Sequence, residues 1–273
     1  MQHHSSLTSK REFEATGMSD PGRIRQQNED AFAVLADQGI FVVADGIGGT
    51  EGGQVASEAA AAVVPLKLQR RLDNLRRNAA KTKVETVIRA VLQEVNDALV
   101  EKAKEQEGGA GAGTTIVLAL TWRGRFLIAH LGDSRAYLGR DGELQQLTED
   151  HSLAAQLVRW GKITESQAED NPGRSTLLRY LGADEEVEPD FVWITPESGD
   201  QVLLCTDGLT NMVEDRGIAE VLAASIGVGE SCQRLVERAN EAGGKDNITA
   251  LVIRFKEGGR VQSHGGDLRE EIR

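Results

Sequence analysis

The sequence predicts an α+β fold in which the sheets are mostly antiparallel. Apolar, strand-like runs follow one another with only short turns between them, and short connections join antiparallel strands. The two longest helical patterns are neighbours in the chain and do not alternate with strands, which argues against a βαβ winding. No Pro- or Ser-rich linker divides the 273 residues, so we expect one domain. Two sheets stacked face to face, with helices outside, would bury both helical stripes.

The first half of the chain is expected to form a hairpin followed by two helices. The predicted elements are strands at 30–36 and 40–45, a helix that begins between 48 and 53, a helix around 84–99, and a Gly-rich loop at 106–113. Asp37-Gln38-Gly39 forms the hairpin turn. Apolar residues from Val55 to Val64 recur at helical spacing, and we expect Pro65 to kink or end that helix. Apolar residues from Val84 to Leu99 mark one face of the next helix.

The second half reads as mainly strands with short helices between them. The predicted elements are strands at 114–122, 126–131, 136–138 and 144–147, a helical pattern at 150–170, strands at 187–194 and 201–206, helices at 215–225 and 230–242, and a last strand at 248–255. Gly124 and Asp141-Gly142 mark turns. We expect residues 1–10 to be a disordered leader, 11–256 to be the folded domain and 257–273 to be a mobile tail.

Charge and cysteine content exclude several classes of function. The net charge of −12 argues against a nucleic-acid partner, because phosphate backbones select basic surfaces. Cys205 lies in an apolar run and Cys232 in a helical pattern, so we expect no disulfide framework and a reducing, cytoplasmic location. No apolar run approaches the roughly 20 residues of a membrane span, so we expect no membrane partner.

Three aspartates share one local setting, at the end of a strand beside glycine. Asp45 and Asp207 each end an apolar run and precede a glycine, and Asp246 follows the glycine turn Gly243-Gly244. Each one alone is more simply explained as a turn or cap aspartate. Brought together, the three would have to repel one another or bind cations. Oxygen-only sites of this kind suit Mg²⁺ and Mn²⁺.

Six segments carry a resemblance to one family, and they are Arg25-Gln26-Gln27-Asn28-Glu29-Asp30, Ala44-Asp45-Gly46-Ile47-Gly48-Gly49, Gly113-Thr114-Thr115, Leu131-Gly132-Asp133-Ser134-Arg135, Thr206-Asp207-Gly208-Leu209 and Asp246-Asn247-Ile248-Thr249. In this order they resemble the metal-dependent Ser/Thr protein phosphatases of type 2C (PPM). Thr148-Glu149-Asp150-His151-Ser152 and Arg179-Tyr180-Leu181-Gly182 resemble its bacterial branch. The resemblance implies a central antiparallel β-sandwich flanked by helix pairs, in four αββα layers, with a metal site at one edge.

The resemblance also implies the ligands of two Mn²⁺ or Mg²⁺ ions. Asp45 would bridge both ions, the carbonyl of Gly46 would serve one, and Asp207 and Asp246 would serve the other. Asp133 would bind a third, weaker ion together with Asp207, unless it is only a turn aspartate stabilised by its neighbour Arg135. The family often has an acid at the place that Asn211 occupies here, so the third site stays an open question.

Other positions are expected to support the metals and the substrate. Glu29 and Asp30 match positions that orient metal-bound water or contact the second ion, although a solvated loop edge remains the alternative for Asp30. Asn247 is expected to support the ligands from the next layer. Arg25 is assigned to the substrate phosphate, because a guanidinium matches two phosphate oxygens. Arg23 is a rival for this role, and an unpaired surface arginine is the alternative.

The general acid of the reaction is not identified by the sequence. Many eukaryotic relatives have a histidine where this chain, like its bacterial relatives, has Ile47. His130 and His151 remain candidates, but a buried, hydrogen-bonded histidine and a helix-cap role explain them more simply. The glycines that follow Ile47 lack the Lys-Ser or Lys-Thr of a nucleotide-binding P-loop. Cys205 lacks the anion-binding loop of a cysteine phosphatase.

Residues 150–182 match a variable, flap-like insertion in the family. Its bases could meet an acidic phosphopeptide, and they are Arg159, Lys162, Arg174 and Arg179. Trp160 could pack against a substrate side chain. An ordinary helical hairpin with exposed bases explains the same residues equally well.

The hypothesis is a Mn²⁺- or Mg²⁺-dependent monomeric phosphatase of phosphoserine and phosphothreonine in proteins. It would oppose a Ser/Thr kinase and use direct water attack. The first alternative is a catalytically silent relative that binds phosphoproteins, but all three aspartates expected of the active enzyme are present. The second is a phosphatase of an anti-sigma-factor antagonist. Such proteins usually carry sensory domains, for which we expect no room here.

Overall fold

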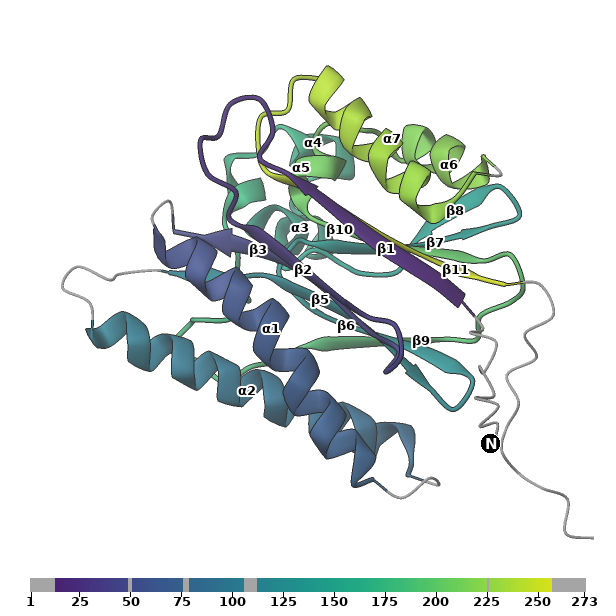
Figure 1. The fold of residues 1–273 in the computed structure, drawn as a ribbon. Helices are drawn as coiled ribbons and strands as arrows, with labels where there is room; N and C mark the ends of the chain where they lie inside the picture. Colours follow the sequence, from purple (N-terminus) through teal and green to yellow (C-terminus); the bar gives the residue numbers. More distant parts are fainter. Residues whose placement is uncertain (1–12, 49–50, 76–78, 106–111, 225, 257–273) are drawn as a thin grey trace, which may run out of the picture.

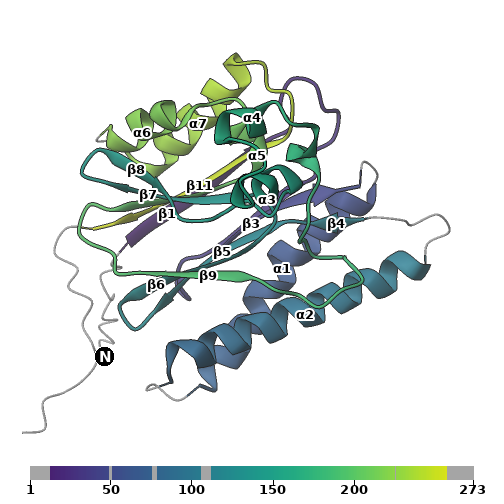
Figure 2. The same ribbon diagram turned by 180° about the vertical axis from the view of Figure 1, so that it is seen from behind.

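The computed structural model describes residues 13–48, 51–75, 79–105, 112–224 and 226–256. Two antiparallel sheets are stacked in the middle, and a pair of helices covers the outer face of each, as Figures 1 and 2 show from opposite sides. The α+β fold in four αββα layers that the sequence predicts is therefore confirmed. The predicted leader at 1–10, Gly49, most of the Gly-rich loop at 106–113 and the tail at 257–273 lie outside the described residues.

The larger sheet has six strands and lies under the two long helices. Its strands are β2 (Asp30–Leu35), β3 (Ile40–Ile47), β4 (Gly113–Thr114), β5 (Ile116–Trp122), β6 (Arg125–Leu131) and β9 (Asp190–Ile194). They follow the order β2-β3-β5-β6-β9, and β4 pairs with β3. The covering helices are α1 (Glu51–Asp73) and α2 (Lys81–Glu105).

The second sheet has five strands and lies under two shorter helices. Its strands, in spatial order, are β1 (Phe13–Asp20), β11 (Ile248–Phe255), β10 (Gln201–Cys205), β7 (Arg135–Arg140) and β8 (Glu143–Gln146). The covering helices are α6 (Asp215–Ala223) and α7 (Val228–Glu241). Four short elements lie near one end of the sandwich, namely α3 (Leu153–Arg159), α4 (Glu165–Glu169), the 3₁₀ turn η1 (Pro172–Ser175) and α5 (Asp207–Thr210).

The apolar strands are buried on both faces, which explains their uninterrupted hydrophobic runs. In β3, Val42 and Ala44 pack under α1 and α2, whereas Phe41 and Val43 point into the core between the sheets. Successive side chains of a strand point to opposite faces, so every residue of these runs meets a packed layer. The aromatic ring of Phe41 meets that of Phe13 edge to face, with centroids 5.5 Å apart.

Several boundaries differ from the prediction. Strand β1 was not predicted, because its sequence Phe-Glu-Ala-Thr-Gly-Met-Ser-Asp carries little apolar alternation, and it gains its partner only through β11. Pro65 does not end α1, which continues for two more turns to Asp73, and Val63 on the predicted stripe is 37% exposed. Only Asp190–Ile194 of the strand predicted at 187–194 is extended in the sheet. None of the described helices is long and apolar enough to cross a membrane.

Candidate metal centre

The antiparallel topology brings the predicted acids to one edge of the sandwich. Asp30 at the start of β2 pairs with Asp45 near the end of β3. In the other sheet, Cys205 at the end of β10 pairs with Ala250 near the start of β11. Asp207 begins α5 directly after β10, and Asp246 lies in the loop directly before β11. Alternate strand ends meet at the same edge in an antiparallel sheet, so acids that are far apart in the chain become neighbours.

The backbone of Asp45 is fixed by two threonines from the neighbouring strands. Its N–H donates to Thr115 Oγ1 at 3.0 Å, and its carbonyl accepts from Thr115 N–H at 2.9 Å and from Thr114 Oγ1 at 2.9 Å. The next residue, Gly46, donates its N–H to Glu29 O at 3.0 Å. The Asp45 side chain is only partly exposed at the sheet edge. Its main chain therefore has little freedom to move.

Glycine is required at two positions for the backbones of this edge to come close. A Cβ on Gly46 would lie 2.4 Å from Gly53 O, where α1 begins. A Cβ on Gly208 would lie 1.9 Å from Asn247 O, in the loop before β11. Neither contact can be relieved by turning a side chain, because the obstructing atoms belong to the backbone. Glycine at these two positions therefore allows the backbones to approach each other closely.

Asp30 is buried in the centre of the cluster and is held by two hydroxyls. Its Oδ2 accepts from Thr206 Oγ1 at 2.8 Å and from Thr249 Oγ1 at 2.7 Å. Its Oδ1 has no hydrogen-bond partner among the described residues. Burial raises the pKa of Asp30 to about 7, although the two hydroxyls oppose the rise. The expectation of a solvated loop edge for Asp30 is wrong, because only 8% of the residue is exposed.

Burial and repulsion by neighbouring carboxylates raise the pKa values of the carboxyl groups of Asp45 and Asp207. Burial raises the pKa of Asp45 well above its ordinary range, and the charges of Asp30 and Asp207 raise it further. Burial and the charge of Asp246 raise the pKa of Asp207, whereas hydrogen bonds to Asn211 and Asp45 oppose the rise. Like charges in a partly dry site disfavour ionisation. At neutral pH the cluster therefore retains protons unless positive charge is supplied.

Asn247 ties the loop that precedes β2 to the start of β11. Its Oδ1 accepts from Glu29 N–H at 2.8 Å, and its Nδ2 donates to the carbonyls of Pro21 at 3.0 Å and Gln27 at 2.8 Å. This amide uses both its acceptor and its donors on one loop. Burial raises the pKa of the Glu29 carboxyl, while the charge of Arg25 lowers it.

Arg25 lies at the solvent side of the cluster. Its Nη2 donates to Asp246 Oδ2 at 2.8 Å, and half of the arginine side chain stays exposed. The nearby Arg23 donates its backbone N–H to Gly244 O at 2.7 Å. Of the two rivals, Arg25 is the one whose guanidinium is paired with an acid of the site.

A cavity of about 220 Å³ adjoins the cluster on the side of Asp133. Asp133, Asp207, Asn211 and Arg174 contribute to its lining. Asn211 Nδ2 donates to Asp207 Oδ2 at 3.0 Å, and Arg174 Nη2 in turn donates to Asn211 Oδ1. Burial raises the pKa of Asp133 to about 8, helped by the charges of Asp207 and Asp150. A larger cavity of about 530 Å³ lies at the opposite end of β10, beside Gln201 and Arg254, away from these acids.

The structure gives the contacts of three further residues. Arg135 forms a two-pronged ion pair with Asp150, with N–O distances of 2.8 and 2.7 Å, and its charge opposes the rise in the pKa of Asp133. The N-cap of α3 is Ser152, and His151 directly precedes it. Cys205 is fully buried and burial raises the pKa of its thiol to about 12, so it is no nucleophile.

The bases of the 150–182 segment are mostly engaged within the chain. Arg159 pairs with Glu149 at 3.0 Å, and Arg179 pairs with Asp190 at 3.1 Å. Arg174 reaches Asn211 as described above. Trp160 is 64% exposed and is therefore open to solvent. Thr206 and Thr249, whose hydroxyls donate to Asp30, were given no role from the sequence, because Asp30 comes from a distant strand.

The donor set fits hard divalent cations. The groups that face this edge are carboxylate and carbonyl oxygens, the ligands that Mg²⁺ and Mn²⁺ prefer. The unsatisfied Oδ1 of Asp30 and the raised pKa values of Asp45 and Asp133 show that the cluster lacks compensating positive charge of its own. Two or more cations at this edge would supply it.

Comparisons with known proteins agree with the fold. The family model described as protein phosphatase 2C matches residues 23–250. Serine/threonine phosphatase stp of Listeria monocytogenes is 39% identical over 241 residues, which are 86% of this chain and 93% of the relative. The crystal structure of the serine/threonine phosphatase Stp1 from Staphylococcus aureus superimposes with a TM-score of 0.80 at 31% identity, covering 94% of this chain and 99% of that chain.

A further solved structure is the catalytic domain of the serine/threonine protein phosphatase PstP in complex with two manganese ions. It superimposes with a TM-score of 0.73 at 35% identity, covering 90% of this chain and 99% of that chain. The fold thus places the chain among the metal-dependent protein phosphatases. The chain belongs to the protein phosphatase 2C family and is a serine/threonine protein phosphatase by class.

Proposed function

We propose that this enzyme hydrolyses phosphoserine and phosphothreonine in proteins with the help of two Mn²⁺ or Mg²⁺ ions at the acidic edge. The observation that carries the proposal is the convergence of Asp45, Asp207 and Asp246 from three separate segments. The burial of Asp45 and Asp207, together with the repulsion of these two carboxylates by their neighbours, favours bound cations over free carboxylates. An inactive scaffold would have no need to keep such a destabilising cluster.

The ligand roles in this proposal are those that the resemblance to the family implies. Asp45 is repelled by Asp30, Asp207, Asp133 and Asp246, which supports its role as a ligand of both cations. The carbonyl of Gly46 would serve one cation, and Asp207 and Asp246 the other. When bound, the cations supply positive charge that activates a water molecule and neutralises phosphoryl oxygens.

The surrounding residues bind and orient. Half of the Arg25 side chain stays exposed beside Asp246, so its remaining N–H groups can donate hydrogen bonds to two phosphate oxygens. Asn247 holds the Arg25 loop against β11 and thereby sets the height of the guanidinium over the site. Glu29 and Asp30 would accept hydrogen bonds from water at the cluster.

The leaving group has no obvious protein donor in this proposal. His130 and His151 are each 1% exposed and are bonded to neighbours within the fold, so neither can reach a substrate oxygen. Ile47 offers no proton. We therefore assign protonation of the serine or threonine alkoxide to solvent.

Finer aspects of the proposal concern the domain and its partners. Residues 11–256 would form the single catalytic domain, with 150–182 as a flap beside the site. A Ser/Thr kinase would supply the phosphoprotein substrates, and the enzyme would act as a cytoplasmic monomer. The two free, buried cysteines support a reducing compartment. Sedimentation velocity of the pure protein tests the monomer directly.

Activity on a small phosphate ester and on a phosphothreonine peptide tests the proposal. Hydrolysis should require Mn²⁺ and stop in EDTA. Asp207→Asn should lower turnover by several orders of magnitude, whereas Asp184→Asn, at a surface ion pair with Lys104, should leave it unchanged. Activity that survives chelation would refute the metal mechanism.

The same assay separates the alternatives once a phosphorylated anti-sigma-factor antagonist is added as a third substrate. A silent phosphoprotein-binding relative would bind the phosphothreonine peptide without hydrolysing it. A phosphatase of an anti-sigma-factor antagonist would hydrolyse the third substrate far faster than the peptide.

A further inference from the structure

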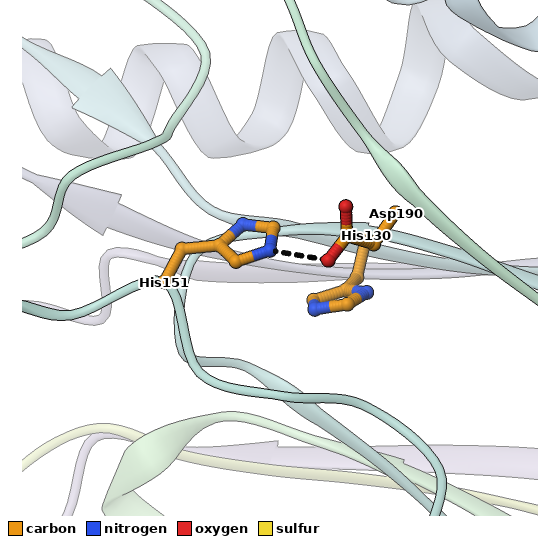
Figure 3. A group of neighbouring side chains, drawn as sticks. All are labelled: His130, His151 and Asp190. Carbon is orange, nitrogen blue, oxygen red and sulfur yellow. Dashed lines mark hydrogen bonds and ion pairs between the residues drawn. The ribbon is translucent and has the colours of Figure 1, made fainter. Parts of the chain in front are cut away.

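A cluster outside the acidic edge contains two buried histidines and one aspartate whose side chain is 44% exposed. His130 on β6 and Asp190 on β9 are cross-strand partners, and His151 lies in the segment that leads into α3 (Figure 3). One nitrogen or oxygen from each of the three side chains lies within 4.8 Å of the others. The imidazole rings of His130 and His151 are stacked, with centroids 4.5 Å apart and planes 23° apart. This cluster could be a metal site or a structural relay.

The hydrogen bonds distinguish a metal site from a structural relay, because they fix the tautomer of His151. Gly132 N–H donates to His151 Nδ1 at 3.3 Å, so this nitrogen is an acceptor and carries no proton. The proton of the neutral ring is then on Nε2, which donates to Asp190 Oδ2 at 3.2 Å. Figure 3 shows this bond. Both ring nitrogens are engaged, and His151 has no lone pair left for a cation.

His130 and Asp190 complete the argument against a metal. His130 Nε2 lies 2.9 Å from the carbonyl oxygen of Glu149, an acceptor, so Nε2 carries the proton of His130. Its Nδ1 keeps a lone pair but finds no partner among the described residues. Lone pairs lie in the ring planes, and the planes of the two stacked rings are nearly parallel and offset, which is a poor geometry for binding one cation with both rings. Asp190 is moreover already paired with Arg179 at 3.1 Å.

His151 forms hydrogen bonds to both backbone groups of Gly132. Besides accepting from Gly132 N–H, His151 donates its own backbone N–H to Gly132 O at 3.0 Å. Gly132 has a positive φ of 105°, and a Cβ there would lie 2.6 Å from the side chain of Thr115. The backbone thus holds a conformation that only glycine adopts easily, and such a turn needs its flanking contacts to stay in place.

The turn that begins at Gly132 leads directly to the acidic edge. Asp133 follows Gly132 and lines the cavity that Asp207 also lines. Ser134 is next, and its Oγ lies 2.7 Å from Thr115 Oγ1, the atom that accepts from Asp45 N–H. The turn Gly132–Ser134 is therefore connected to the acidic edge in two ways. The Asp133 side chain lines the same cavity as Asp207, and Ser134 hydrogen-bonds to the threonine that holds the backbone of Asp45.

We propose that His151, oriented by Asp190 and backed by the ring of His130, is a positioning residue that fixes the Gly132–Ser134 turn and with it the Asp133 carboxylate. The consequence for cations rests on the proposed role of Asp133 as ligand of a third, weaker ion. Burial lowers the pKa of His151 to about 4, so the ring stays neutral and keeps its Nδ1 acceptor at physiological pH.

Two substitutions at His151 separate its two hydrogen bonds. In His151→Asn the amide oxygen can take the place of Nδ1 and still accept from Gly132. In His151→Gln the longer amide reaches toward Asp190 but leaves Gly132 N–H without its acceptor. A role limited to filling space would make both variants equally damaging, whereas the positioning role predicts that asparagine rescues and glutamine does not.

The first readout is the Gly132 amide in metal-free, ¹⁵N-labelled protein. Its hydrogen exchange should accelerate at least tenfold in His151→Gln and stay within threefold of wild type in His151→Asn. Imidazole ¹⁵N shifts should show His151 neutral at pH 7 with the proton on Nε2. An unchanged Gly132 amide in the glutamine variant, or a proton on Nδ1, would overturn the inference.

The second readout is Mn²⁺ binding by titration calorimetry, with Asp133→Ala as reference. The reference should lose the weak binding event, and His151→Gln should weaken it at least fivefold while leaving the tighter events unchanged. Weak binding that is lost in Asp133→Ala but normal in His151→Gln would contradict the inference. An unchanged isotherm in Asp133→Ala would instead refute only the ligand role of Asp133, because the Gly132 readout does not depend on it. A cation found between His130, His151 and Asp190 would overturn the tautomer assignment.

Discussion

Replacing Asp133 by asparagine is expected to stabilise the metal-free protein at neutral and alkaline pH. The carboxyl group lies close to Asp207 and Asp150, and burial together with these charges raises its pKa to about 8 from an ordinary value of 3.8. Asparagine has nearly the same shape but no charge to bury. The substitution should therefore remove an electrostatic cost that the enzyme tolerates for its function.

The magnitude follows from proton linkage. Between pH 3.8 and about 8 the folded protein keeps a proton on Asp133 that the unfolded chain releases, so folding stability falls as pH rises through this window. Each pH unit corresponds to about 1.4 kcal/mol for one group, which sets an upper limit of roughly 6 kcal/mol over the whole window. Because neighbouring carboxyls share the repulsion, we expect the advantage of Asp133→Asn to grow by at least about 2 kcal/mol between pH 5 and pH 8.

Urea unfolding of EDTA-treated protein at pH 5, 6, 7 and 8 measures this difference. Asp184→Asn, whose side chain is 79% exposed, serves as the control and should stay within about 0.5 kcal/mol of wild type at every pH. Excess Mn²⁺ should shrink or reverse the advantage of the Asp133 variant, because a cation that binds only the folded state stabilises the wild type. An advantage that is absent at pH 8, or that does not change with pH, would refute the reasoning.

Three further predictions concern the same edge. Thr249→Val should cost about 1.5–3 kcal/mol in the metal-free protein at pH 8, because the charged Asp30 loses a hydrogen bond of 2.7 Å; a loss below 0.5 kcal/mol in urea unfolding, by the same principle, would contradict this. Gly208→Ala should destabilise by about 2–3 kcal/mol through its clash with Asn247 O, whereas Gly229→Ala, inside α7 with its nearest neighbouring atom 4.0 Å from the new Cβ, should not; equal melting temperatures would contradict this. Mn²⁺ binding at pH 7 should release protons from carboxyls of raised pKa, so calorimetric heats should differ between buffers of different ionisation enthalpy, and identical heats would disprove it.

Much of the fold was predictable because most strands are buried on both faces. Runs such as Ile40–Ala44 and Val202–Cys205 are apolar without interruption, and the turn residues between them stand out in the sequence. Strand β1 escaped prediction because its pattern is weak and its position depends on pairing with β11, more than 200 residues later. The prediction that Pro65 could end its helix was wrong, because α1 continues to Asp73 with Val64 and Leu68 buried in the core on either side of the proline.

Asp45 and Asp207 could be named from the sequence because each sits beside glycine at the end of an apolar run, and Asp246 because it follows a glycine turn shortly before the last one. Their surroundings could not, because the partners are brought by other strands. Nothing local to Asp30 indicates the hydroxyls of Thr206 and Thr249. In the same way, the motif containing His151 does not reveal that its ring accepts from Gly132 N–H.

The measurement that tests the central claim most directly is a crystal structure grown in millimolar Mn²⁺ with anomalous data collected. We predict at least two anomalous peaks at the acidic edge, both within coordination distance of the Asp45 carboxylate and flanked by Asp207 and Asp246. A map without anomalous peaks at the acidic edge, or with peaks only elsewhere in the molecule, would contradict the account.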